Sequence, residues 1–227
     1  MLQGLAAFIE HQHSLNHTIY LAFVSHIIFD PAVILDVAAI TALFREYGII
    51  TCVDAAHAMG QIKLNLTAMD PDIYVADGYK WLYAPRGSAV MYVKKEFQHL
   101  MYPVVISTRN PFTTSFQERF DWLGLKDYVP YLAMKAALEF RQQIGEDAII
   151  DYLHEMAMQG GRRVAEIWQT RLYVEEEEYV AGLVSVVLPN NNISGWDTSR
   201  VGNEYNLFLR VNTNNLYGDA VARFTTQ

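Results

Sequence analysis

The stretch IITCVDAAHAMGQIKLNLTAMDPDIYVADGYKWLYAPRGSAVMYVKK, residues 49–95, decides the fold class of this 227-residue chain. Its first five residues, 49–53, form an apolar run that predicts a buried strand. Asp54 follows this run directly, and His57 comes three positions later. The first part of the stretch therefore predicts an acid and an imidazole just beyond the end of a strand.

A second apolar run, residues 73–76, leads into Gly78 and then Lys80, and a third covers residues 88–93. In an open α/β sheet, functional groups collect beyond the carboxyl ends of the strands. We therefore expect Lys80 to lie at the same sheet edge as the acid and the imidazole.

The residues on either side of this stretch predict an α/β protein. Residues 18–28 are a nearly continuous apolar run, typical of a buried strand, and residues 37–47 have the periodicity of an amphipathic helix ended by Gly48. Strand, helix and strand at this spacing form a βαβ unit, which implies parallel strands. The fold class expected is a mainly parallel sheet with flanking helices.

The texture changes towards the C-terminus. The elements expected there are helices at 130–144 and 148–172, the second interrupted at Gly160-Gly161, and strands at 181–188 and 205–211. We therefore predict a larger domain over residues 1–145 and a small α+β domain over residues 146–227.

Composition excludes several classes of function. A net charge of -8 offers no basic surface for nucleic acid. The single cysteine, Cys52, excludes a disulfide framework and is consistent with a reducing, cytoplasmic location. No apolar run reaches the roughly 20 residues of a membrane span, so no membrane partner is expected. The seven histidines show no paired ligand spacing, so no metal site is expected.

Each candidate residue also has a simpler interpretation. A lysine beyond a buried strand has its pKa lowered by desolvation and can form a Schiff base, but Lys80 could equally be a surface lysine. Asp54 could pair with a protonated pyridine nitrogen or with a neighbouring lysine. His57 could face the same pocket or form one hydrogen bond in the core.

The combination is more specific than its parts. Strand-Asp-x-x-His, crossover, and strand-x-Gly-Tyr-Lys-Trp-x-x-x-Pro-x-Gly resembles the class V (fold type I) pyridoxal-phosphate aminotransferase family. The resemblance is to its isopenicillin-N-epimerase-like and cysteine-desulfurase-like branch. It implies that residues 1–145 form half of the large, cofactor-binding domain of fold type I, so that the chain is N-terminally truncated relative to the family.

The resemblance implies a role for each matching residue. Lys80 would be the Schiff-base lysine that also moves the substrate Cα proton, and Asp54 would pair with the pyridinium nitrogen. The remaining cofactor contacts would come from His57, Tyr79 and His26. Arg223 would bind the substrate carboxylate, with Arg210 as the alternative.

The chain also departs from the family pattern. Tyr79 replaces a histidine, Asp77 replaces a small polar phosphate ligand, and Leu125 replaces a threonine that reaches the phosphate of the neighbouring subunit. The resemblance still implies a homodimer and an amino acid substrate.

Three hypotheses follow. The first is a pyridoxal-phosphate enzyme of aminotransferase or epimerase type. The second is a catalytically inactive, truncated relative that serves as a binding or oligomerisation module. The third is cysteine desulfurase or lyase chemistry, for which Cys52 is poorly placed because it lies within a predicted buried strand.

Overall fold

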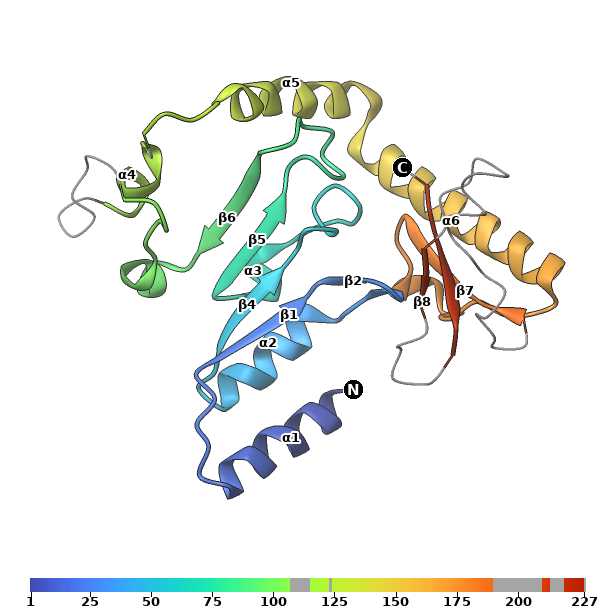
Figure 1. The fold of residues 1–227 in the computed structure, drawn as a ribbon, viewed down its shortest axis with the longest axis horizontal. Helices are drawn as coiled ribbons and strands as arrows, with labels where there is room; N and C mark the ends of the chain where they lie inside the picture. The colour runs from blue at the N-terminus through green and yellow to red at the C-terminus, as the bar shows by residue number, and fades with distance from the viewer. Residues whose placement is uncertain (107–114, 123, 190–209, 213–218, 227) are drawn as a thin grey trace. The chain divides into compact units, whose positions relative to one another are not determined.

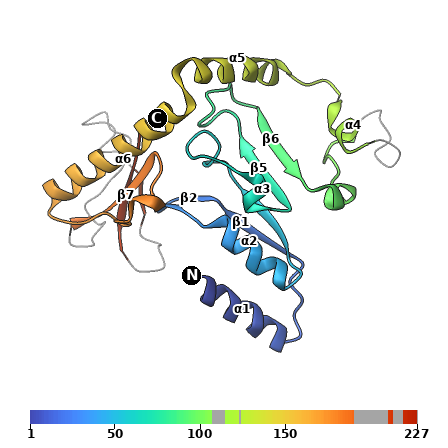
Figure 2. The same cartoon turned by 180° about the vertical axis from the view of Figure 1, so that it is seen from behind.

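The computed structural model describes residues 1–106, 115–122, 124–189, 210–212 and 219–226. The chain forms two compact units (Figures 1 and 2). The first unit comprises Met1–Val24, Val37–Asp54 and Asn65–Leu138, and the second comprises Ser25–Asp36, Ala55–Leu64 and Glu139–Gln227. The domain boundary near residue 145 stays a prediction.

The first unit is built on a four-stranded sheet. Its strands, in the order β1-β4-β5-β6, are β1 (Leu21–Ser25), β4 (Ile50–Asp54), β5 (Ile73–Asp77) and β6 (Ala89–Val93). β4 and β5 are parallel, with Asp54 opposite Val75, and β5 and β6 are antiparallel. Because β4 and β5 run in the same direction, their carboxyl ends share one edge of the sheet.

Helices accompany this sheet. They are α1 (Leu2–Ser14), α2 (Val37–Glu46), α3 (Leu66–Met69), the 3-10 helix η1 (Lys95–Leu100) and α4 (Phe116–Asp121). α2 follows the expected helix closely and buries Val37, Ile40 and Phe44. α4 begins with a capping box in which Ser115 and Glu118 satisfy each other's backbone N–H groups.

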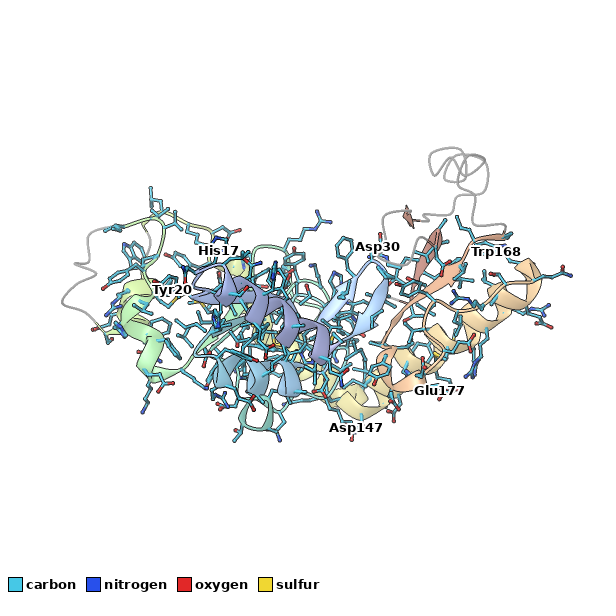
Figure 3. All side chains as sticks on the ribbon, turned by 90° about the horizontal axis from the view of Figure 1, so that it is seen from below. His17, Tyr20, Asp30, Asp147, Trp168 and Glu177 are labelled. Atoms are coloured by element: carbon cyan, nitrogen blue, oxygen red, sulfur yellow. The ribbon has the colours of Figure 1, made fainter. Side chains whose placement is uncertain are left out.

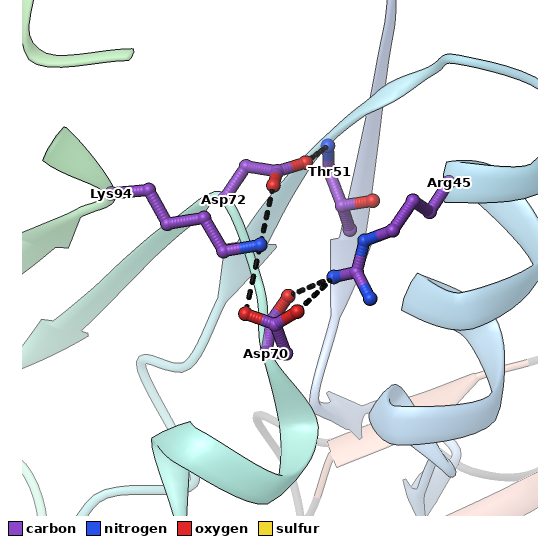
Figure 4. A network of polar contacts seen from close by, with 5 residues as sticks. All are labelled: Arg45, Thr51, Asp70, Asp72 and Lys94. Carbon is purple, nitrogen blue, oxygen red and sulfur yellow. Dashed lines mark hydrogen bonds and ion pairs between the residues drawn. The ribbon is translucent and has the colours of Figure 1, made fainter. Parts of the chain in front are cut away.

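A polar network closes the edge of the sheet at the amino ends of β4 and β5 (Figure 4). Asp72 accepts a hydrogen bond from the buried backbone N–H of Thr51 at 2.8 Å and pairs with Lys94 at 3.0 Å. Asp70 joins it by ion pairs with Lys94 at 2.8 Å and Arg45 at 2.6 Å. The network therefore ties the start of two strands together, at the edge opposite Asp54 and Asp77.

The second unit packs a helix on a sheet. α6 (Glu146–Trp168) packs on the antiparallel sheet β7-β9-β8, formed by β7 (Leu183–Val187), β8 (Arg210–Asn212) and β9 (Val221–Thr225). A core cluster that includes Ala157, Met158 and Val186 fills the space between helix and sheet. The short 3-10 helix η2 (Glu177–Tyr179) precedes β7. A hairpin of β2 (Ile27–Phe29) and β3 (Ala32–Ile34) completes the unit, and Figure 3 labels Asp30 in its turn.

α5 (Val129–Ile144) confirms the helix expected after Pro130. Two expectations were wrong. The apolar run at 18–28 contains β1 and most of β2 instead of one strand. Residues 27–29 do not continue β1, because they pair with residues 32–34, which fold back on them. α6 also runs through Gly160 and Gly161 without a break.

The strand expected at 205–211 falls mostly outside the described residues. Among those that are described, no helix has both the length and the apolar composition to cross a membrane.

Candidate functional site

The first unit brings an acid and a lysine to one edge of its sheet. Asp54 is the last residue of β4, and Asp77 is the last residue of the neighbouring parallel strand β5. Lys80 follows three residues later, and its Nζ lies 2.8 Å from Asp77 Oδ2. Both side chains of this pair are largely buried, at 28% and 24% exposure. Asp54 and Lys80 thus lie at or just after the carboxyl ends of two adjacent parallel strands, and their roles at a cofactor stay predictions.

The turn that carries Lys80 is anchored on both sides. The Gly78 N–H donates to Ser88 O at 3.0 Å, and the Ala84 N–H donates to Gly78 O at 3.1 Å. The next residue after Lys80, Trp81, is fully buried. A Cβ on Gly78 would lie 2.7 Å from both Ser88 Oγ and Met134 Cε, so a larger residue here would require these side chains to move. These contacts fix the backbone from which the lysine projects.

The partner of Asp77 at this edge was not predicted from the sequence. By the family resemblance, Asp77 stands in place of a small polar residue that binds the phosphate. In the structure this carboxylate faces the Lys80 ammonium group instead. The i, i+3 spacing of the two charges across the turn is the signal that could have revealed the pair. Tyr79 also lies close, with its ring centroid 5.9 Å from Lys80 Nζ.

Cys52 lies on β4, two residues before Asp54, and is partly buried. Burial raises the pKa of the Cys52 thiol, and the charge of Asp54 raises it further. A raised pKa keeps the thiol protonated and therefore a weak nucleophile at neutral pH. The described residues also contain no cluster of three His, Cys, Asp or Glu side chains suited to a metal ion.

In the second unit, the loop that carries His57 is held by two buried side chains that sequence reasoning missed. Gln61 is 1% exposed; its Nε2 donates to His57 O at 2.6 Å, and its Oε1 accepts from the Gly182 N–H at 2.7 Å. Arg141, also 1% exposed, donates to Gly60 O at 2.9 Å and pairs with Glu146. These partners lie 81 and 121 residues apart in the chain, so no local pattern could indicate them.

His26 lies in the core of the second unit. Only 5% of it is exposed, and it precedes β2. Burial lowers the pKa of His26 to about 4, although the nearby Asp36 charge opposes the shift. The imidazole is therefore neutral at physiological pH. Its predicted contact with the cofactor stays a prediction.

Arg223 lies on β9 and contacts Phe29 of the hairpin in two ways. Its Nη1 donates to Phe29 O at 3.1 Å, and its guanidinium carbon lies 5.4 Å from the centroid of the Phe29 ring. The other predicted arginine, Arg210, is opposite Arg223 in the β8–β9 register. The His57 ring is stacked on the same Phe29 ring, with centroids 6.0 Å apart and planes at 13°. Two predicted site residues thus share one aromatic neighbour.

The segment expected to reach a neighbouring subunit lies in the first unit. Leu125 is fully exposed, and Trp122 stacks on Tyr128 with ring centroids 5.8 Å apart. An exposed leucine offers no hydrogen bond to a phosphate.

The chain is similar in sequence to known proteins. A model described as aminotransferase class-V matches residues 3–223. Over 199 residues the chain is 33% identical to the L-cysteine desulfhydrase-like protein lolT1 of Epichloe uncinata, covering 74% of this chain and 44% of that protein. It is 29% identical over 184 residues to the isopenicillin N epimerase of Streptomyces clavuligerus, covering 74% and 46%.

Solved structures share the fold. A C-DES mutant with glycine covalently linked to its pyridoxal-phosphate cofactor superposes with a TM-score of 0.75 at 19% identity, covering 91% of this chain and 55% of that one. The chain spans about half the length of the relatives it matches.

Proposed function

We propose, since the chain belongs to the aminotransferase class-V family, that it works as part of a pyridoxal-phosphate-dependent enzyme acting on an amino acid. This family is pyridoxal-phosphate-dependent, and the matched C-DES structure holds that cofactor. The observation that carries the proposal is that Asp54 ends β4 and Lys80 follows the end of β5, two adjacent parallel strands.

The residues at this edge fit the ring of the cofactor. Asp54 supplies a carboxylate for the protonated pyridine nitrogen, and Lys80 supplies a primary amine for the aldehyde. Tyr79 supplies a hydroxyl donor. Asp77 does not oppose this fit, because its charge is already paired with Lys80 at 2.8 Å. In the first unit, the part of the cofactor that fits the described residues is therefore its ring.

The bound cofactor would supply an electron sink for the negative charge that develops at the substrate Cα. Asp54 would keep the pyridine nitrogen protonated. Because an ammonium group is no nucleophile, Lys80 would first pass a proton to the Asp77 carboxylate, which lies 2.8 Å away, and this would leave a neutral amine beside a neutral Asp77. The Lys80 amine, once displaced by substrate, would accept the Cα proton and return it. We assign the substrate carboxylate to Arg223, and the remaining cofactor contacts to His57 and His26.

The names of two relatives and the position of Cys52 narrow the reaction type. Cα deprotonation by Lys80 is a first step common to aminotransfer, epimerisation and loss of sulfide from cysteine. The name of lolT1 favours the last of these, and that of the Streptomyces clavuligerus relative favours epimerisation. Transfer of sulfur to the chain's own cysteine is the least favoured reaction, because Cys52 lies on β4 with a raised pKa.

The test is covalent capture of the cofactor. The purified chain should take up pyridoxal phosphate with a new near-visible absorbance band, and borohydride should fix the cofactor permanently. After digestion, mass spectrometry should find it on the peptide that contains Lys80. Lys80→Ala should abolish the band, whereas Lys95→Ala, a change at an exposed lysine of the same unit, should retain it.

A chain that takes up no cofactor, or that carries it equally in Lys80→Ala, contradicts the proposal. That result would favour the alternative function, a non-catalytic relative acting as a binding or oligomerisation module. The feature that favours this alternative is Leu125, fully exposed where a phosphate-binding threonine is expected.

A further inference from the structure

We propose that Phe29 is a positioning residue that orients Arg223 for an incoming carboxylate and holds the His57 ring beside it. This inference rests on the proposed function and deepens it, because it adds a residue on which neither sequence motif nor family resemblance drew. All of the residues that carry it lie in the second unit.

The two residues that flank the turn of the β2–β3 hairpin are each hydrogen-bonded to one residue of a paired position in the β7–β9 ladder. Phe29 and Ala32 are opposite each other in the β2–β3 pair, and Ser185 and Arg223 are opposite each other in the β7–β9 pair. The Ala32 N–H donates to Ser185 Oγ at 3.0 Å, in a buried position. Arg223 Nη1 donates to Phe29 O at 3.1 Å. The backbone at Phe29 is thus fixed relative to β9, the strand that carries the arginine.

The Phe29 side chain adds an interaction that the backbone bond does not supply. The guanidinium carbon of Arg223 lies 5.4 Å from the centroid of its ring, within the range of a cation–π contact. This contact stabilises the Arg223 rotamer that places the guanidinium over the ring, relative to the other rotamers of the side chain. A carboxylate that binds the arginine then loses less conformational entropy.

The same ring also orients the imidazole. The His57 and Phe29 rings are nearly parallel, at 13°, with centroids 6.0 Å apart. The His57 backbone is fixed independently, by the 2.6 Å hydrogen bond from Gln61. The ring of Phe29, 40% exposed, therefore touches the groups assigned to the substrate and to the cofactor. Loss of the ring should disturb both groups, whereas addition of a hydroxyl group to the ring should disturb neither.

The experiment compares three substitutions by NMR, in the chain without cofactor. Phe29→Leu keeps an apolar side chain and the backbone bond but removes the ring, and Phe29→Tyr keeps the ring. Phe23→Leu makes the same chemical change at an exposed phenylalanine of the first unit. The signals observed are the Nε–Hε pair of Arg223 and the ring C–H pairs of His57, and glycine is the carboxylate probe.

The ring-current shifts of both signals should be present in the wild type and in Phe29→Tyr, and lost in Phe29→Leu. The dissociation constant of glycine, followed at the Arg223 signal, should rise about three- to tenfold in Phe29→Leu, the size of one cation–π contact. Phe23→Leu should match the wild type.

Several results would overturn the inference: retained shifts in Phe29→Leu, unchanged glycine affinity in that variant, or no response of Arg223 to glycine in the wild type. Failure of the proposed function is detected separately, by the absence of Lys80-dependent cofactor uptake. Phe29→Ala, with folding checked by circular dichroism, provides a second ring-free variant and should behave as Phe29→Leu does.

Discussion

His26 is the side chain whose titration the fold alters most clearly. It is 5% exposed, and burial lowers its pKa from 6.5 to about 4. Between these two pH values the unfolded chain binds a proton on His26 that the folded chain does not. The stability contributed by keeping this histidine neutral is therefore fully present above pH 6.5, and it is lost as the pH falls towards 4.

The first prediction concerns this pH dependence. His26→Gln should remove up to about 3 kcal/mol of the acid-induced loss in unfolding free energy between pH 6.5 and 4. Urea titrations at several pH values would measure it. His99→Gln, at an exposed histidine, should keep the wild-type slope. A parallel slope in His26→Gln would show that the buried imidazole does not control acid stability.

At the residue scale, sequence reasoning succeeds where chain order and spatial order coincide. Asp54 ends β4 and Lys80 follows β5, and these two strands are neighbours in the sheet. It fails for Phe29, whose contact with Arg223 spans 194 residues. Gln61 and Arg141 were missed for the same reason, because what gives them a role is a long-range buried hydrogen bond.

Among the elements, α6 shows why glycines in a helix need not end it. A Cβ on Gly161 would lie 2.8 Å from Val184 Cγ2 and 3.0 Å from Leu172 Cδ2, whereas one on Gly160 would meet nothing within 4 Å. Gly161 therefore allows α6 to approach β7 closely. A helix break was expected at this pair because a glycine within a helical pattern can serve either close packing or a change of chain direction, and the sequence does not distinguish the two.

The adjacent glycines predict effects of opposite sign. Gly160→Ala should stabilise the fold by about 0.5–1 kcal/mol, because alanine restricts the unfolded chain and favours helix. Gly161→Ala should destabilise it by about 1–3 kcal/mol through overpacking. Thermal and urea unfolding of the two variants would measure both changes. Equal effects would contradict the close contact between α6 and β7.

The polar network at the amino ends of β4 and β5 gives a third prediction (Figure 4). Asp72→Ala should destabilise the fold by about 2–4 kcal/mol, because it leaves the buried Thr51 N–H and the Lys94 ammonium without this acceptor. Asp72→Asn should recover part of the loss by accepting the Thr51 hydrogen bond. Asp70→Asn, at a side chain that is 44% exposed, should cost about 1 kcal/mol or less.

Urea unfolding of the three variants ranks these effects. A cost for Asp70→Asn equal to that for Asp72→Ala would mean that the ion pairs, and not the buried backbone bond, stabilise the strand starts. Neither Asp70 nor Asp72 lies at the edge that holds Lys80, so cofactor uptake by the folded fraction should persist in all three variants.

For the whole molecule, the main feature is apolar surface at the ends of the first sheet. β1 and β6 are its terminal strands among the described residues, and the exposed side chains there include Leu21, Phe23, Val90 and Tyr92. Tyr20, labelled in Figure 3, adds a further ring beside β1. Exposed strand edges with apolar side chains promote association. The homodimer expected from the family stays a prediction.

Association should depend on the β1 edge. Phe23→Lys should lower the concentration-dependent mass measured by light scattering, because a charge opposes strand pairing. Phe8→Lys provides the matched control, since Phe8 is similarly exposed but lies on α1. If both variants associate equally, the edge of β1 is not the surface that associates.

The fold class was predictable from hydrophobic periodicity because a helix separates β1 from β4 and another separates β4 from β5 along the chain. The division into units was not. The second unit gathers Ser25–Asp36, Ala55–Leu64 and Glu139–Gln227 from three separate stretches, and periodicity carries no information on which distant segments pack together.

The strand order β7-β9-β8 also has a consequence for how the protein is made. β9, Val221–Thr225, is the middle strand, and it pairs with both of the strands that precede it in the chain. During translation, β7 and β8 have no shared partner until residue 225 has been synthesised. The hydrogen bond from Ala32 to Ser185 cannot form until residue 185 has been synthesised, and the hydrogen bond from Arg223 to Phe29 cannot form until residue 223 has been synthesised. The second unit must therefore complete its folding late, after the ribosome has added β9, whereas the sheet of the first unit needs nothing beyond residue 93 to pair its four strands.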